Sequence, residues 1–190
     1  MIIGNKSQFA IESVITQAYE RLSFRALGYF VIHIENICFG VVSPDATMLA
    51  CSFDEVANRI IDRGTHTAPF SEESSAKKIA DSICSSIYSD EQKLERFFGV
   101  SRPKFIETVN SNKLIWAPDG DEAFDDGSHI LQFDIDNRVR LIGFKRGGSD
   151  PEEYHSLTDI WLDADGFYTI LQRWHDAFES EWATMTKTTA

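Results

Sequence analysis

Long hydrophobic runs are missing from this 190-residue chain. Its longest apolar stretches, Ala26–Ile32 and Ile37–Val42, fall far short of the roughly 20 residues that span a bilayer. The N-terminus, Met1–Lys6, has neither the basic segment nor the long apolar segment of a secretion signal. These absences predict a cytoplasmic protein that has no membrane partner.

Cysteines are few, and their number is odd. Cys38, Cys51 and Cys84 lie far apart, which excludes a disulfide framework, and no Cys-x-x-Cys pair exists to hold a structural zinc ion. Each cysteine has apolar sequence neighbours. We therefore expect three buried thiols.

Catalytic and cofactor-binding motifs are also missing. No two of the five histidines are three or four residues apart, and the sequence contains no Gly-x-Ser-x-Gly elbow, Walker loop or Gly-x-Gly-x-x-Gly turn. The acidic clusters do not fit the ligand spacing of a calcium loop. The sequence thus predicts no enzyme, no catalytic residue, no metal and no cofactor. One alternative stays open: His66, in the hydroxyl-rich link Gly64–Phe70, either orders this link or serves a small enzyme or ligand-binding protein.

Basic residues are scarce, with 18 Lys and Arg against 30 Asp and Glu, for a net charge of −12. Residues 1–116 hold 14 acids and 12 bases (net −2), residues 117–182 hold 16 acids and 5 bases (net −11), and Lys187 adds +1. This balance disfavours binding to nucleic acid or to anionic membranes. It favours a basic protein partner, which opposite charge steers into contact. Plain solubility is the simpler alternative.

The acidity has two foci, and each contains one aromatic residue. An aromatic side chain surrounded by charge is typical of a protein-binding anchor, although Phe124 would equally suit a core position that holds its loop down. The predicted partner-binding residues are Asp119, Asp121, Glu122, Phe124, Asp125 and Asp126 in the first focus, and Glu152, Glu153 and Tyr154 in the second.

The first half of the chain reads as strands followed by helices. Residues Phe9–Ile15 are rich in strand formers, and two further runs flank Glu35-Asn36 as in a hairpin. Residues 48–51 fit either a short strand or the lead into a helix. Capping boxes at Ser52 and Ser89, together with an apolar stripe after Ser71, predict three helices. The predicted helices span 53–63, about 71–87 and 89–98.

The second half returns to strands and ends in a helix. The segment Arg102–Asn110 is ambiguous. The expected strands are Lys113–Trp116, His129–Ile135, Arg138–Lys145 and Asp159–Leu162, the middle two forming a hairpin. Asp163 or Asp165 caps a last helix, whose stripe comprises Phe167, Ile170, Leu171, Trp174, Phe178 and Trp182. Because strands and helices do not alternate regularly, we predict an α+β fold. It is a single domain over 1–183, with a mainly antiparallel sheet, a central helical segment and the aromatic-rich C-terminal helix packed on the sheet; the polar tail 184–190 is expected to fray.

Several segments of the chain resemble one known family. They are Ile3–Lys6 with Phe9–Glu12, Leu49–Val56, Arg63–Phe70, Val139–Lys145 and the closing aromatic helix. With these segments the chain, from about Met1 to Trp182, resembles the immunity proteins of bacterial polymorphic toxin systems, specifically immunity family forty-two.

The resemblance implies a small cytosolic α+β protein that is encoded beside a toxin and holds it inactive. Such toxins pass between neighbouring bacteria, for example by contact-dependent growth inhibition, and many are nucleases. The expected partner is therefore a basic toxin domain, neutralised by stoichiometric occlusion. The family supplies no shared binding residues, so the residues proposed above follow from charge alone. A non-catalytic adaptor with no toxin remains the other alternative; the oligomeric state, the open strand edge and the choice between plugging the active site and binding elsewhere on the toxin are left undecided.

Overall fold

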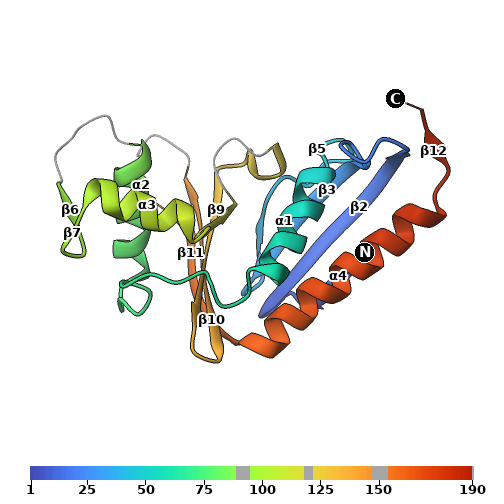
Figure 1. Ribbon diagram of the computed structural model, residues 1–190. Helices are drawn as coiled ribbons and strands as arrows, with labels where there is room; N and C mark the ends of the chain where they lie inside the picture. Colours follow the sequence, from blue (N-terminus) through green and yellow to red (C-terminus); the bar gives the residue numbers. More distant parts are fainter. Residues whose placement is uncertain (89–94, 118–121, 147–153, 190) are drawn as a thin grey trace.

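The computed structural model describes residues 1–88, 95–117, 122–146 and 154–189. Within these ranges, a four-stranded antiparallel sheet stands in the middle of the molecule. Two helices, α2 and α3, cover one side of it, and α1, α4 and a six-stranded sheet lie on the other side (Figure 1). The predicted α+β fold in one domain with mainly antiparallel sheets is confirmed.

The six-stranded sheet comes almost entirely from the first 50 residues. Its main path is antiparallel, in the order β1-β2-β3-β4. The predicted hairpin forms at Glu35 and Asn36, whose φ angles of 52° and 67° are those of a tight turn that matches the twist of its strands. The strands are β1 (Ile2–Asn5), β2 (Phe9–Tyr19), β3 (Ala26–Ile34), β4 (Ile37–Phe39), β5 (Thr47–Met48, paired with β3) and β12 (Lys187–Thr188, paired with β2).

The four-stranded sheet has the order β11-β10-β9-β8. Its strands are β8 (Ile115–Ala117), β9 (Ser128–Ile135), β10 (Arg138–Arg146) and β11 (Tyr154–Asp163). Both of its faces are buried. Val139 and Leu141 of β10 enter the core shared with the six-stranded sheet, whereas Ile142 and Phe144 enter the core under α2 and α3. This explains why β9 and β10 read as nearly continuous apolar runs.

The helices are α1 (Ala50–Ile61), α2 (Ala76–Tyr88), α3 (Arg102–Ser111) and α4 (Ala164–Thr184), and a two-strand ribbon of β6 (Arg96–Phe97) and β7 (Val100–Ser101) precedes α3. The ambiguous segment is thus helix α3. The third predicted helix, 89–98, lies outside the described residues up to 94, and β6 occupies part of the remainder.

Helix α1 begins earlier than its sequence pattern predicts. Leu49 is its N-cap, and no side chain caps it, so the predicted capping box at Ser52 is wrong. Ser52 instead lies inside the helix, where its hydroxyl is buried without a hydrogen-bond partner. The early start also turns Cys51 outward. Cys51 is exposed and Cys38 is half-buried, so only Cys84 matches the expectation of buried thiols.

Helix α4 confirms the prediction for the end of the chain. Asp163 is its N-cap and accepts a hydrogen bond from the Gly166 backbone N–H at 2.8 Å. The apolar stripe packs into the core shared with the six-stranded sheet. There Trp174 is fully buried, and its indole N–H donates to Ser13 Oγ at 3.0 Å. The tail differs from its expected frayed state, because Lys187 and Thr188 pair with β2 as strand β12. Throughout the described ranges, every helix is too short or too polar to span a bilayer.

Candidate functional site

The first acidic focus is partly visible as a single 3-10 turn, η1 (Glu122–Phe124). Glu122 and Asp125 are exposed at its two ends. Between them Ala123 is fully buried, and its carbonyl accepts a hydrogen bond from the Val41 N–H at 2.8 Å, just past the end of β4. The two exposed carboxylates therefore stand on a short segment fixed to the six-stranded sheet.

Phe124 lies in the core. Its side chain is 5% exposed and meets the Phe30 ring edge-on, with ring centroids 6.2 Å apart. Of its two possible roles, the structure shows the one in which Phe124 holds the loop down. The Phe124 ring is therefore not exposed at the surface of the described structure.

Asp126 is held by β10. Its Oδ2 lies 2.5 Å from Lys145 Nζ, and its Oδ1 accepts from the Ser128 N–H at 3.2 Å. These bonds lower the pKa of Asp126 against the opposing effect of burial, which is the larger single influence. The next residue, Gly127, has a φ of 79°, and a Cβ there would lie 1.9 Å from the Arg146 carbonyl oxygen. The Asp126 carboxylate thus holds its loop against β10 and is not a free surface charge.

The second focus is described only from Tyr154 onward. Tyr154 pairs with Arg146 in the β10–β11 ladder, and its ring contacts Phe144 at a centroid distance of 4.9 Å. Burial, with Cys84 and Asp81 nearby, raises the pKa of its hydroxyl. Tyr154 is therefore half-buried against α2 instead of standing free.

The strand register nevertheless brings the two foci together. Ser128 pairs with Lys145 on one side of β10, and Tyr154 pairs with Arg146 on the other. The segments that carry the foci therefore meet at the same end of the four-stranded sheet. The remaining predicted residues, Asp119, Asp121, Glu152 and Glu153, lie outside the described residues.

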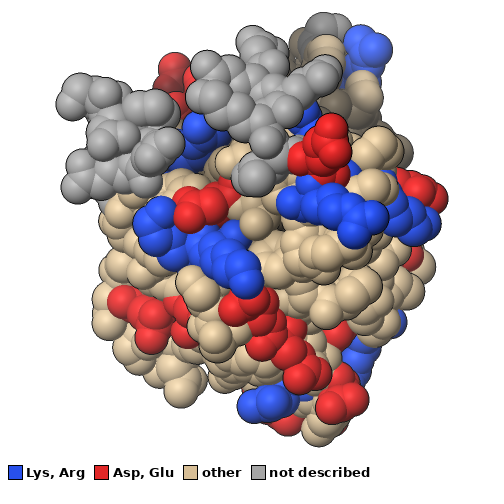
Figure 2. All heavy atoms as spheres, turned by 90° about the vertical axis from the view of Figure 1, so that its left-hand side faces the viewer, with Lys and Arg blue, Asp and Glu red and all other residues tan. Residues whose placement is uncertain are grey.

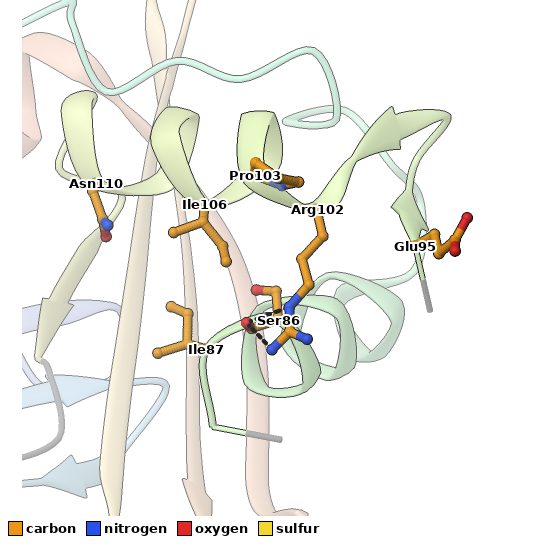
Figure 3. A pocket seen from close by; sticks show the side chains of 7 residues that line it. All are labelled: Ser86, Ile87, Glu95, Arg102, Pro103, Ile106 and Asn110. Carbon is orange, nitrogen blue, oxygen red and sulfur yellow. Dashed lines mark hydrogen bonds between the residues drawn. The ribbon is translucent and has the colours of Figure 1, made fainter. Parts of the chain in front are cut away.

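A surface pocket of about 740 Å³ lies between α2 and α3. Ile87, Pro103 and Ile106 supply its apolar lining, and Arg102 donates from Nε and Nη2 to the Ser86 carbonyl at 3.1 and 2.9 Å (Figure 3). Acidic and basic side chains are interspersed on the surrounding face (Figure 2), several of them in ion pairs. This face thus lacks the field of one sign that the charge count predicted for a partner surface.

A buried polar network joins α1, the link after it, β9 and α4. Arg59 is fully buried, with Nη1 donating to Gln132 Oε1 at 3.0 Å and Nη2 to the Ile115 carbonyl at 2.9 Å. Gln132 donates to the Tyr168 hydroxyl at 2.9 Å, and that hydroxyl donates to Asp134, 2.9 Å from each carboxylate oxygen. These hydrogen bonds connect α1 and α4 to strands β8 and β9 of the four-stranded sheet.

His66 belongs to this network and has no access to solvent. Its side chain is fully buried, and Nδ1 donates to the Asn112 carbonyl at 3.0 Å, while its backbone N–H and carbonyl both bond to Asp134. Nε2 has no partner. The histidine orders the link, and a substrate cannot reach it in this structure. Over the described residues, no three His, Cys, Asp or Glu side chains are grouped so that they would hold a metal ion.

Burial of His66 makes stability depend on pH. Burial first, and then the positive charge of Arg59, lowers the pKa of His66 below its ordinary 6.5, against the raising effects of the Asn112 hydrogen bond and of the Asp134 and Asp62 carboxylates. The unfolded chain therefore binds the proton more readily, and the stabilisation is complete above about pH 6.5 and lost as the pH falls below it, by at most about 1.4 kcal/mol per pH unit.

The variant His66→Asn isolates this effect, since its side-chain amide can still donate to the Asn112 carbonyl but does not titrate near neutral pH. Urea unfolding at about pH 7.5 and about pH 5.5 measures it. We expect the wild type to lose more stability than the variant on acidification. Equal losses would contradict the buried, neutral state of His66.

Sequence reasoning missed both the pocket and Arg59. The pocket depends on the packing of α2 against α3, and α3 was the ambiguous segment. Arg59, by contrast, left a signal. It follows Val56 by three residues on the apolar stripe of α1, and Gln132 and Asp134 share the face of β9 that carries the buried Ile130. Polar residues at three core positions indicate a buried network.

Comparison with known proteins agrees with this architecture. The chain matches the family described as Immunity protein 42 over residues 1–177. Among solved structures it is similar to CdiI from Burkholderia dolosa AUO158, with a TM-score of 0.58 and 17% identity, covering 93% of this chain and 99% of that one. At this identity the likeness concerns the fold. No curated protein matches the chain. The match over nearly its whole length shows that the chain belongs to the Immunity protein 42 family.

Proposed function

We propose that this protein is an antitoxin that binds one cognate toxin domain, a nuclease, in the cytoplasm and blocks it by occlusion. Membership in an immunity protein family is the single observation that carries the antitoxin role. The net charge of −12 supports a nuclease as the target, because an enzyme that binds a polyanion must present a basic surface. An acidic protein can cover that surface without any chemistry of its own.

The end of the four-stranded sheet supplies the acidic contact. Glu122 and Asp125 are exposed on a turn that Phe124 and the Val41–Ala123 hydrogen bond hold in place. A fixed turn loses little conformational entropy when a partner binds, so less of the attraction between charges is offset. The prediction from sequence also includes Asp119, Asp121, Glu152 and Glu153, which lie outside the described residues.

Titration of the toxin domain encoded beside this gene tests the proposal. Nuclease activity is measured while the purified chain is added, and complex formation is followed by calorimetry. We expect activity to end at a fixed molar ratio, as for a stoichiometric inhibitor. Loss of activity at far lower ratios would mean that the chain acts on the toxin as a catalyst. Absence of binding would favour the adaptor.

Charge reversal tests the acidic contact. The double variant Glu122→Lys with Asp125→Lys is expected to slow toxin association about tenfold at low salt, and less at high salt, because steering acts through the screened field. Stopped-flow mixing measures the rate. The matched control, Glu20→Lys with Glu107→Lys, changes the net charge equally at exposed sites elsewhere. Equal slowing in both variants would assign the effect to net charge. No slowing in either would show that this turn does not contribute to toxin association.

A further inference from the structure

Strand β11 is a long edge strand with an open side. It has ten residues and pairs with β10, and among the described residues no strand pairs with its other side. Its exposure agrees: Asp159, Ile160, Trp161 and Leu162 are all half-exposed, whereas the neighbouring β10 is almost fully buried from Val139 to Phe144. An edge of this kind presents a row of backbone donors and acceptors to a partner.

The other sheet edges are short or already occupied. Past the end of β4, the Gly40 N–H donates to Ser128 Oγ at 3.0 Å and the Val41 N–H to the Ala123 carbonyl. Beside β8, the Arg59 guanidinium donates hydrogen bonds to the carbonyls of Lys113 and Ile115. The remaining edge strands, β1, β5, β12 and the two strands of the β6–β7 ribbon, have at most four residues each. Over the described part of the chain, β11 is therefore the longest strand that has one side without a strand partner.

Strand β11 also lacks the usual protection of an edge. Natural edge strands carry lysine, proline or a charge that discourages pairing. From Leu157 to Asp163 there is no lysine and no proline. Both acids are already engaged, Asp159 with Arg140 at 2.7 Å and Asp163 as the cap of α4. The only irregularity, a register shift near Ser156 (φ 70°), lies at the start of the strand and leaves the rest regular.

The register identifies which backbone groups face outward. The Ala164 N–H donates to the Asn137 carbonyl at 3.0 Å, and successive residues of a strand bond alternately to its two sides. Leu162 and Ile160 therefore bond to β10, whereas the N–H and C=O groups of Trp161 and Asp159 point to the open side. Among the described residues, nothing else hydrogen-bonds to these outward groups.

We propose that β11 is the docking edge for an extended, basic segment of the toxin, which adds to the sheet as a fifth strand. Main-chain bonds supply the affinity in this mode, and side chains flanking the strand supply specificity. Charge selects this occupant over a second copy of the chain: β11 lies within residues 117–182, which carry a net charge of −11, so two copies repel where a basic segment is attracted.

Amide hydrogen exchange, read residue by residue by NMR, tests the docking edge on the intact chain with and without the toxin domain. In the free protein, the amides of Asp159 and Trp161 should exchange fast and those of Ile160 and Leu162 slowly. In the complex, we expect Asp159 and Trp161 to become as protected as their neighbours. Docking through side chains alone would not produce this alternating pattern.

A pair of variants at Trp161 tests the same point by affinity. Both Trp161→Pro and Trp161→Val remove the indole, but only proline also removes the outward N–H, which the ladder to β10 does not use. We expect the proline variant to bind the toxin about tenfold more weakly than the valine variant. If the proline variant does not fold, the amide hydrogen exchange pattern alone tests whether β11 is the docking edge.

The inference rests on the proposed antitoxin function, but the two can fail separately. Stoichiometric binding with Asp159 and Trp161 still unprotected would overturn the docking edge and leave the antitoxin role intact. Absence of toxin binding would overturn both. Protection of the same amides in a toxin-free dimer, identified by sedimentation, would overturn the choice of occupant.

Discussion

A chain that ends at Gly166 is expected to lose its cooperative fold. This truncation removes α4, and with it Phe167, Leu171, Trp174 and Phe178, all at most 1% exposed. Deleting one large buried aromatic side chain costs about 3–5 kcal/mol, and a domain is stabilised by only about 5–15 kcal/mol in all. The loss therefore exceeds the total stability. Circular dichroism during heating measures it, and a cooperative transition in the truncated chain would contradict the prediction.

A shorter truncation provides the matched control. A chain that ends at Met185 keeps all of α4 and loses only β12, which pairs with β2 through two residues. We expect it to fold with a slightly lower midpoint of thermal unfolding. The same loss of cooperativity in both chains would place the essential contacts in the tail instead of in the helix.

The substitution Arg59→Met is expected to destabilise the protein by about 3–5 kcal/mol. Methionine fills similar space, but it leaves Gln132 Oε1 and the carbonyls of Lys113 and Ile115 without the donors that Arg59 provides. Burial lowers the pKa of Arg59 to about 10 despite the carboxylate of Glu55, so the guanidinium is still charged at neutral pH. Denaturant unfolding measures the loss.

The control for Arg59 is Glu55→Gln. Glu55 is the ion-pair partner of Arg59, with Oε1 2.9 Å from Nε, but its side chain is 34% exposed. Glutamine keeps a side-chain oxygen that can accept from Nε, so this change should cost less than Arg59→Met. An equal loss in both variants would mean that the ion pair, and not the set of hydrogen bonds to β8 and β9, provides the stability.

The sequence predicted those parts of the fold that depend on local pattern. The two hairpins follow from short turns between strand-forming runs, and α4 follows from an aspartate cap before a long stripe. The errors occurred where tertiary packing outweighs a local signal. Ser52 carries a capping box, yet the apolar contacts of Leu49 and Ala50 begin the helix earlier. The tail is polar, but its backbone pairs with β2.

The candidate site was harder to predict, because charge counts do not show which side chains are free. Asp126 forms an ion pair with Lys145, and Phe124 is buried. Tyr154 is half-buried beside Cys84 and Asp81 of α2. The open edge could not be predicted either, since an edge depends on strand order, and strand order arises from contacts distant in sequence. What the sequence did supply was the short strand Asp159–Leu162, which is part of β11, and its lack of lysine and proline.

The two-faced central sheet constrains how this chain can diverge. Successive residues of β10 alternate between two separate cores, so one inserted residue would send Val139 and Leu141 into the wrong core and Ile142 with them. An insertion in β10 is therefore expected to disrupt both cores. A substitution on β11 does not shift this register, so exposed positions of the strand such as Leu157 can change with less effect on the two cores.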